Sequence, residues 1–240
     1  MPAPTIGAVT TAPGEVRQFR FLRPPGATTI LLIRHGESVP ARVDMPFSLV
    51  DGQGDPELDA AGHQQALRVA ERLSGEPIAG VYVSTLRRTV ETAAPLATRL
   101  GLVPVVEADV REVHLGEWEG GLFRVRVAEG HPIAQQMIAS QRWDVIPGAE
   151  PADEFAARVR AALLRIAGRH PDEMVAVFTH GGVIGQAFAE ATGGRSFAFT
   201  GADNGSISHL VITDERWVVR TYNDTAHLHP GFAPVAEALT

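Results

Sequence analysis

The stretch that decides the fold is Ile30–Ser38, ILLIRHGES. Four consecutive apolar residues are typical of a short strand buried on both faces, as in a parallel sheet. The run ends at Arg34 and His35, and the glycine that follows permits a tight turn and a close approach of backbone N–H groups to a ligand. The same pattern returns in residues 175–182, VAVFTHGG, where His180 follows the strand. Two predicted strands therefore end in a histidine.

In open α/β sheets, ligands bind beyond the carboxyl ends of the strands. If the two strands are neighbours, His35, His180 and Arg34 meet in one small volume. Burying unpaired cationic groups is costly, but a multiply charged anion among them makes the arrangement favourable. One His-Gly pair after a strand mostly reflects turn chemistry, whereas two in one chain predict a site for an anion such as phosphate.

From residue 30 onward, predicted strands alternate with predicted helices. This order predicts an α/β fold, a three-layer αβα sandwich with a mostly parallel central sheet. Ser84 is predicted to cap the second helix, which Gly101 would end. The strands are predicted at 30–33, 78–84, 102–110 and 174–178, with a hairpin over 206–222, and the helices at 60–73, 86–100, from Pro151 to about 168, and 182–192.

Composition divides the chain into three parts. Residues 1–29 are rich in Pro, Ala, Gly and Thr and are predicted to be a flexible extension. Residues 30–240 are predicted to form a single domain. Within it, the apolar residues of 121–150 follow neither helical nor strand spacing, and this segment is predicted to form a lid-like insertion over the site. The insertion offers four candidates for binding a charged substrate, with plain exposure to water as the equal alternative; they are Arg124, Arg126, His131 and Arg142.

Charge and cysteine content exclude several classes of function. The net charge of −7 over 240 residues argues against broad nucleic-acid binding, which needs a basic surface. The chain has no cysteine, which excludes disulfides and thiolate chemistry. No apolar run approaches the roughly 20 residues that span a bilayer. The N-terminus does not resemble a secretory signal. We therefore expect a cytoplasmic enzyme with no membrane or nucleic-acid partner.

Five segments, in order, resemble motifs of the histidine phosphatase superfamily, which includes cofactor-dependent phosphoglycerate mutases and many phosphatases. The resemblance spans about residues 30–228 and implies a phosphoglycerate mutase-like fold. The segments are LLIRHGES (31–38), DPELDAAGHQQA (55–66), VYVSTLRRTVETA (81–93), VREVHLGEWEG (110–120) and VFTHGGVI (177–184).

The resemblance also implies roles for individual residues. His35 falls at the phosphorylated nucleophile and Glu112 at the proton donor, with Glu117 the rival if the motif register differs. Three cationic donors would surround the phosphate, so no metal or other cofactor is expected; they are Arg34, Arg88 and His180. Further substrate-binding residues are expected at Gly36, Ser38, Arg42, Arg87 and Gly181. Judged alone, Arg87 and Arg88 are better explained as solvated residues or as partners of Glu91.

One position departs from the family pattern. Many members carry an asparagine that contacts the phosphate where this chain has Ala41. Either the pocket loses a neutral donor, or Arg42 or Ser38 replaces it. The departure makes a mutase that handles a bisphosphorylated intermediate less favoured.

The leading hypothesis is a metal-independent phosphatase, a phosphoric monoester hydrolase that acts on a small phosphorylated metabolite through a phosphohistidine on His35. The first alternative is a phosphoglycerate mutase-like phosphotransferase with the same phosphohistidine. A catalytically silent interaction module and a His/Glu metal hydrolase are weaker alternatives. A homo-oligomer is compatible with the sequence.

Overall fold

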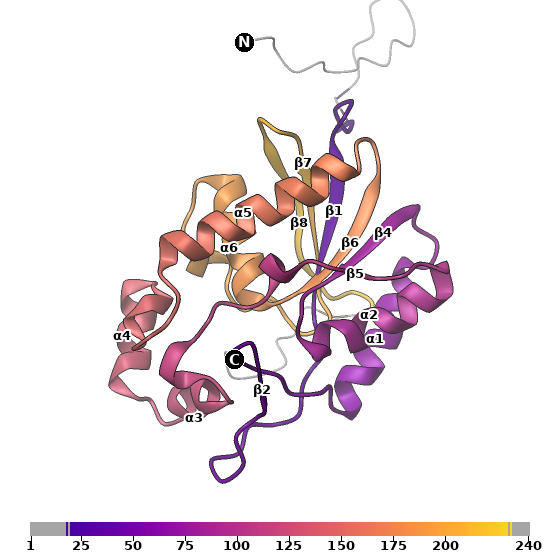
Figure 1. The fold of residues 1–240 in the computed structure, drawn as a ribbon. Helices are drawn as coiled ribbons and strands as arrows, with labels where there is room; N and C mark the ends of the chain where they lie inside the picture. The colour runs from indigo at the N-terminus through magenta and orange to yellow at the C-terminus, as the bar shows by residue number, and fades with distance from the viewer. Residues whose placement is uncertain (1–17, 19, 230, 232–240) are drawn as a thin grey trace, which may run out of the picture.

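The computed structural model describes residues 18, 20–229 and 231 (Figure 1). Residues 1–17 and 19 of the predicted extension lie outside the described residues. The first strand, β1, spans Thr28–Arg34 and so begins two residues before the predicted domain start.

The central sheet has six strands in the order β5-β4-β6-β1-β7-β8. The pairs β5–β4, β4–β6 and β6–β1 are parallel, while β7 and β8 add an antiparallel hairpin beside β1. The mostly parallel sheet is therefore confirmed. The bounds of the further strands are β4 Ile78–Val83, β5 Val105–Val106, β6 Met174–Thr179, β7 Ile207–Ile212 and β8 Trp217–Asp224.

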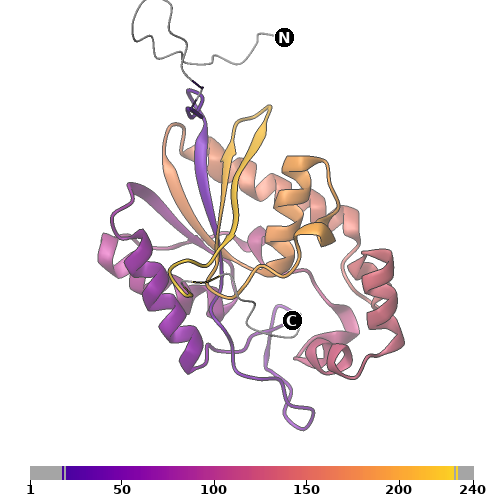
Figure 2. The ribbon, with the colours of Figure 1, turned by 180° about the vertical axis from the view of Figure 1, so that it is seen from behind.

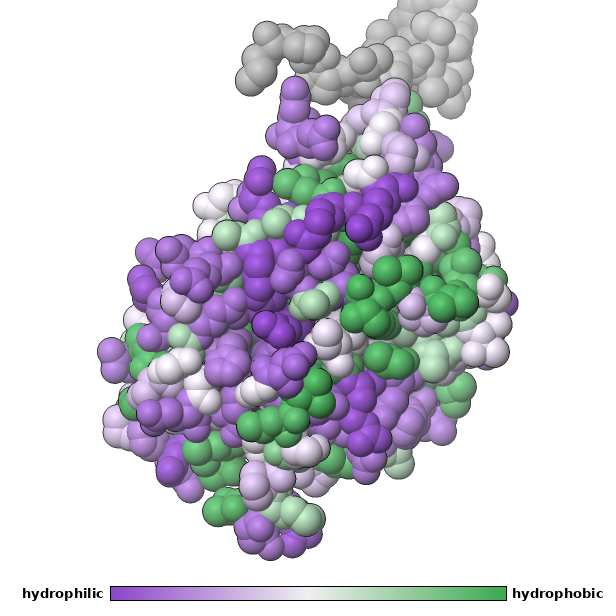
Figure 3. All heavy atoms as spheres, viewed as in Figure 1, coloured by the Kyte–Doolittle hydropathy of each residue, from purple (hydrophilic) through white to green (hydrophobic). Residues whose placement is uncertain are grey.

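Helices cover both faces of this sheet (Figures 1 and 2). Successive residues of a strand point to opposite faces, and β1 is apolar on both. Ile30 and Leu32 pack in one core with α5 (Ala152–Arg169) and α6 (Gly181–Thr192). Leu31 and Ile33 pack in a second core with α1 (Ala60–Leu73) and α2 (Arg87–Leu100). The outward face of α5 is hydrophilic (Figure 3). The three-layer sandwich is confirmed.

Two sequence predictions at element ends were wrong. The third extended segment shrinks to the two residues of β5 and continues as a 3-10 turn over Ala108–Val110. Ser84 does not cap α2, whose N-cap is Leu86 with no side-chain bond. Gly101 does end α2, in the left-handed conformation with φ 67°.

The predicted insertion at 121–150 folds into α3 (Leu122–Ala128), α4 (Pro132–Ser140) and a 3-10 turn at Trp143–Val145. These short elements share a small core of their own, which explains why no single helical period runs through the segment. Its buried members are Trp118, Ala134, Met137 and Ile146. A two-stranded ribbon, β2 (Leu49–Val50) and β3 (Gln53–Gly54), completes the fold.

Candidate active site

His35 and His180 lie side by side because β1 and β6 are neighbours in register, with Arg34 opposite Thr179. The ring centroids are 5.2 Å apart. Nδ1 of His35 lies 2.7 Å from the carbonyl oxygen of Gly36. A carbonyl only accepts hydrogen bonds, so Nδ1 carries the proton and Nε2 keeps its lone pair. The hydrogen bond within the turn thus fixes the tautomer that a nucleophilic histidine needs, with Nε2 unprotonated.

His180 is fully buried at the N-terminus of α6. Its Nε2 lies 2.9 Å from Oγ of Ser84, the residue predicted to cap α2. Its Nδ1 is buried and has no hydrogen-bond partner among the residues that the structure describes. A buried polar nitrogen without a partner is costly, so Nδ1 is suited to an oxygen bound beside His35.

Both imidazoles are neutral at neutral pH. Burial, and then the charges of Arg88 and Arg34, hold the pKa of His35 well below 6.5. The pKa of His180 is also held well below 6.5, first by burial and then by Arg88, His35 and Arg34. A neutral His35 is the nucleophilic form. A neutral His180 differs from the sequence expectation of a third cationic donor, because the neighbouring arginines disfavour a further positive charge.

The depressed pKa of His180 makes stability depend on pH. As the pH falls, His180 takes up a proton in the unfolded chain before it does so in the folded protein. Its contribution to the free energy of unfolding is therefore complete above pH 6.5 and is lost below it. Denaturant titrations at several pH values should show that His180→Gln reduces the acid-side slope of the free energy of unfolding by up to about 1.4 kcal/mol per pH unit. The exposed His63, changed to Gln, is the control. Equal slopes in wild type and His180→Gln would contradict the expectation.

Three guanidinium groups border one cavity of about 380 Å³, whose lining also includes His35 and Glu112. His180 is buried next to His35 and is not part of this lining. Arg34 Nη1 donates to the carbonyl of Ala202 at 2.5 Å, and Arg88 Nη1 donates to that of Gly54 at 2.9 Å. Burial lowers the pKa of Arg88 to about 10, so it stays charged. The third guanidinium belongs to Arg124 of α3. Clustered guanidinium groups in a partly buried cavity form an anion site.

Arg124 is held beside the site by the loop after His35. Its Nη2 donates to Ser38 Oγ at 2.6 Å and its Nη1 to the carbonyl of Val39 at 3.0 Å. Its charge is near enough to lower the pKa of His35. Ser38 thus orients a guanidinium group at the edge of the cavity.

Two of the predicted substrate-binding residues lie away from the cavity. Arg42 forms an ion pair with Asp44 at 3.2 Å and its side chain is 59% exposed. Arg87 pairs with Glu57 at 2.9 Å and Glu91 at 3.0 Å, the partner that the sequence had suggested. In both cases nearby carboxylates hold the guanidinium at the surface. Of the other three, Gly181 is in the cavity lining, and Gly36 accepts from the ring of His35. Ser38 does not line the cavity but contacts Arg124, which does.

Glu112 lies across the cavity at the N-terminus of α6. Its Oε2 accepts a hydrogen bond from the N–H of Gly182 at 3.1 Å, and its Oε1 accepts one from the N–H of Val113 at 3.0 Å. The rival Glu117 is exposed and does not line this cavity. The geometry therefore favours Glu112 over Glu117 as the acid.

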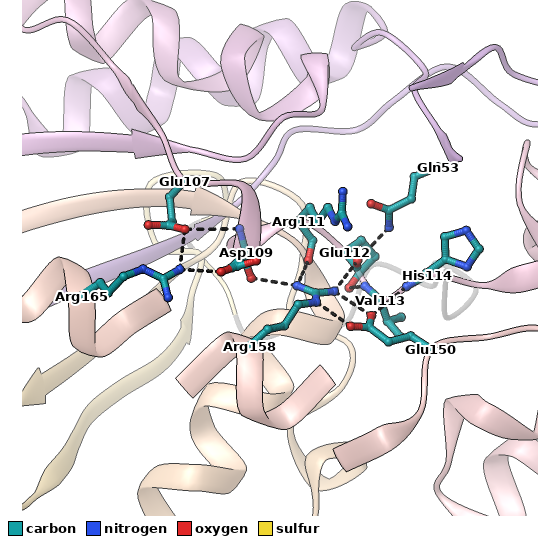
Figure 4. Close-up of polar contacts among 10 residues, drawn as sticks. All are labelled: Gln53, Glu107, Asp109, Arg111, Glu112, Val113, His114, Glu150, Arg158 and Arg165. Atoms are coloured by element: carbon teal, nitrogen blue, oxygen red, sulfur yellow. Dashed lines mark hydrogen bonds and ion pairs between the residues drawn. The ribbon is translucent and has the colours of Figure 1, made fainter. Parts of the chain in front are cut away.

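Arg158 of α5 fixes the loop that carries Glu112 (Figure 4). It donates to the carbonyls of Asp109, Arg111 and Glu112, each at 2.8 Å, and forms an ion pair with the Glu150 carboxylate at 2.6 Å. Gln53 donates a second hydrogen bond to the Glu112 carbonyl at 2.8 Å. This network holds the backbone of the acid while its carboxylate reaches the cavity.

A substitution at Gly182 tests whether the position of the Glu112 carboxylate matters for activity. A Cβ atom there would lie 2.4 Å from Glu112 Oε1, so Gly182→Ala should displace the carboxylate. We expect kcat/KM for an alkyl phosphate to fall at least about tenfold, given that positioned acids contribute about 10²–10⁴-fold. The matched control is Gly168→Ala, also in a helix, where a Cβ meets nothing within 4 Å. Equal activity of the two variants would argue against the placement of Glu112.

Comparison with known proteins decides the family. The model of the histidine phosphatase superfamily (branch 1) matches residues 30–225. The chain belongs to this superfamily. Phosphoglycerate mutase-like protein 4 of Arabidopsis thaliana is 36% identical over 83% of this chain and 86% of its own length. The metal-independent phosphoserine phosphatase of the same plant is 34% identical over 84% and 83%.

Solved structures agree with this assignment. The mycobacterial glucosyl-3-phosphoglycerate phosphatase has a TM-score of 0.70 and 28% identity, over 83% of this chain and all of that chain. The phosphoglycerate mutase-like fold expected for a histidine phosphatase is therefore confirmed, as is the expected class, a phosphoric monoester hydrolase. In the described part of the chain, no helix has the length and hydropathy needed to span a membrane.

Several residues of this histidine phosphatase's site could not be assigned from sequence. Ser84 holds His180 instead of capping a helix. Asn204 donates to the carbonyl of His35 at 2.8 Å from a segment far along the chain. In the sequence, Arg158 is one residue of a predicted amphipathic helix. Only the fold shows that it donates hydrogen bonds to backbone carbonyls such as that of Glu112.

Proposed function

We propose that this histidine phosphatase hydrolyses small phosphomonoesters without a metal, through a phosphohistidine at His35. The observation that carries the proposal is the shared cavity. Its lining combines the ring of His35, whose Nδ1 donates to a carbonyl, with three guanidinium groups and the carboxylates of Glu112 and Glu119. Nε2 is then the nitrogen left to bond phosphorus.

In the first step, Nε2 of His35 attacks phosphorus as the ester P–O bond breaks on the opposite side. Glu112, protonated, gives its proton to the leaving alkoxide. Charge spreads over the equatorial oxygens in such a transition state, where Arg34, Arg88 and Arg124 stabilise it. The buried Nδ1 of His180, with its proton, donates to one of these oxygens while Nε2 accepts from Ser84.

In the second step, the Glu112 carboxylate takes a proton from water, whose oxygen attacks phosphorus as the N–P bond breaks. His35 and protonated Glu112 are regenerated and phosphate leaves. One carboxyl group thus serves as acid and then as base, which fits the single glutamate whose carboxylate lies between Gly182 and the cavity.

The relatives support a metal-independent phosphatase, since one is named a metal-independent phosphoserine phosphatase and another a glucosyl-3-phosphoglycerate phosphatase. Among the described residues, no three His, Cys, Asp or Glu side chains are grouped to hold a metal ion. The three arginines supply positive charge that a metal provides in other phosphatases.

The test is phosphate release from p-nitrophenyl phosphate and from alkyl phosphates, with and without EDTA. We expect equal rates in both conditions. Loss of activity in EDTA, restored by a divalent metal, would overturn the metal-independent mechanism. Incubation with 3-phosphoglycerate distinguishes the phosphotransferase alternative, because a mutase forms the 2-phospho isomer faster than it releases phosphate.

A further inference from the structure

The cavity around His35 is charged at one end and apolar at the other. The phosphate end has the three arginines and Glu112. The remainder is lined mainly by hydrophobic side chains from the insertion and from the 3-10 turn at Ser196–Phe199. They include Phe123, Val127, Met137, Ile138, Trp143 and Phe197. Whatever alcohol is esterified to the phosphate must lie against this wall.

Three of these side chains form a packed aromatic wall. The ring centroids of Trp143 and Phe197 are 4.7 Å apart, and those of Phe123 and Trp143 are 5.9 Å apart. Aromatic rings held by their neighbours offer a large apolar surface with little conformational entropy to lose on binding. The wall is therefore ordered before a substrate arrives.

Most of the charged or titratable side chains of the insertion already bind other groups of the protein and are not directed at a substrate. Arg126 pairs with Glu129 at 2.9 Å and Arg142 pairs with Asp144 at 2.5 Å. His131 caps α4 through the N–H of Ile133 at 3.2 Å and packs against Trp118. None of the three lines the cavity, and only Arg124 of the four candidates does.

Glu119, the second acidic residue in the lining, already accepts hydrogen bonds from the backbone. Glu119 Oε1 accepts from the N–H of Leu115 and Oε2 from the N–H of Gly54, both at 2.8 Å. At the apolar end, a charged group on the alcohol part of a substrate would thus lose part of its water and meet, among the described residues, no oppositely charged side chain, only neutral polar groups such as Gln141, Thr200 and Nε1 of Trp143. Burying an unpaired charge is strongly unfavourable.

We propose that the preferred substrates are phosphomonoesters of uncharged, apolar alcohols, of hexyl size or larger, in place of phosphorylated amino acids or glycerates. The inference rests on the proposed phosphatase function and names the substrate class of that same cavity. The phosphate binds at the arginines, and the alkyl or aryl group packs between α3, α4 and the Phe197 turn.

The test compares kcat/KM for n-propyl and n-hexyl phosphate, whose leaving groups are the same primary alkoxide. Each methylene moved from water to an apolar site gives about a fourfold gain in affinity, so three should raise kcat/KM by at least about tenfold in this partly open cavity. We expect O-phosphoserine and 3-phosphoglycerate to react more slowly than propyl phosphate. A hexyl to propyl ratio near one, or faster reaction of the charged substrates, would overturn the inference.

Variants locate the effect in the cavity. Ile138→Asn should lower the hexyl to propyl ratio at least about twofold, and Phe197→Ala about fivefold or more, because the longer chain loses more apolar contact than the shorter one. Ile138 is 54% exposed, so its replacement should leave folding intact. Leu67→Asn, at a 45% exposed leucine of α1 outside the cavity, is the matched control. An unchanged ratio in both cavity variants would contradict the inference.

The outcome also separates this inference from the proposed function. If no phosphomonoester is hydrolysed, including p-nitrophenyl phosphate, the proposed function fails. If esters are hydrolysed with no preference for hexyl over propyl, only the substrate class fails.

Discussion

Replacement of His35 by alanine is expected to lower kcat for phosphate release by at least about 10⁴-fold, because loss of a catalytic nucleophile typically costs this much or more. The three arginines would still bind the phosphate group, but the nitrogen that attacks phosphorus would be missing. Steady-state assays with p-nitrophenyl phosphate and hexyl phosphate measure the effect.

The control is His63→Ala, at an exposed histidine of α1, which should retain wild-type activity. Circular dichroism and thermal unfolding should show that the His35 variant remains folded, since Ile30–Ile33 still fill both cores. A folded His35→Ala protein that turns over within tenfold of wild type would contradict the nucleophile assignment.

Glu112→Gln has the second largest expected effect, and it depends on the leaving group. For hexyl phosphate, whose alkoxide needs a proton, kcat/KM should fall by about 10²–10⁴-fold. For p-nitrophenyl phosphate, whose leaving group is stable as an anion, the fall should be less than about tenfold. The parameter kcat/KM is used because it reports the first transfer and excludes hydrolysis of the phosphoenzyme.

Glu117→Gln serves as the matched control, since Glu117 is the exposed rival five residues along the chain. It should leave both substrates unchanged. Equal slowing of alkyl and aryl esters by Glu112→Gln would show that Glu112 acts through folding or binding and not as an acid.

Much of the fold could be predicted from local pattern. The limits of α1 match the predicted 60–73, because Asp59 caps the start of its amphipathic stripe and Ser74 follows its end. The β1 and β6 runs were predicted as buried parallel strands, and their pairing then brings His35 and His180 together. The individual strands and helix depend on residues close in sequence, whereas the pairing of β1 with β6 joins distant segments and comes from the fold.

Features that depend on distant partners could not be predicted. Arg42 and Arg124 are both arginines near a phosphate motif, but a carboxylate two residues away holds Arg42 at the surface, whereas Ser38 holds Arg124 at the cavity. The pairing of Arg42 is local, but the contact of Arg124 joins residues 86 positions apart, so no local pattern places Arg124 at the cavity. The charge state of His180 likewise depends on burial and on the nearby Arg88 and Arg34, which only the fold supplies.

The most direct test of the central claim is to mix the protein with hexyl phosphate labelled with ³²P, quench within milliseconds in alkali and map the labelled peptide by mass spectrometry. Alkali preserves a phosphoramidate to histidine. The account predicts one phosphoryl group on His35 that forms no more slowly than turnover and is absent from His35→Ala. Turnover without label on the protein, or label on another residue, would contradict it.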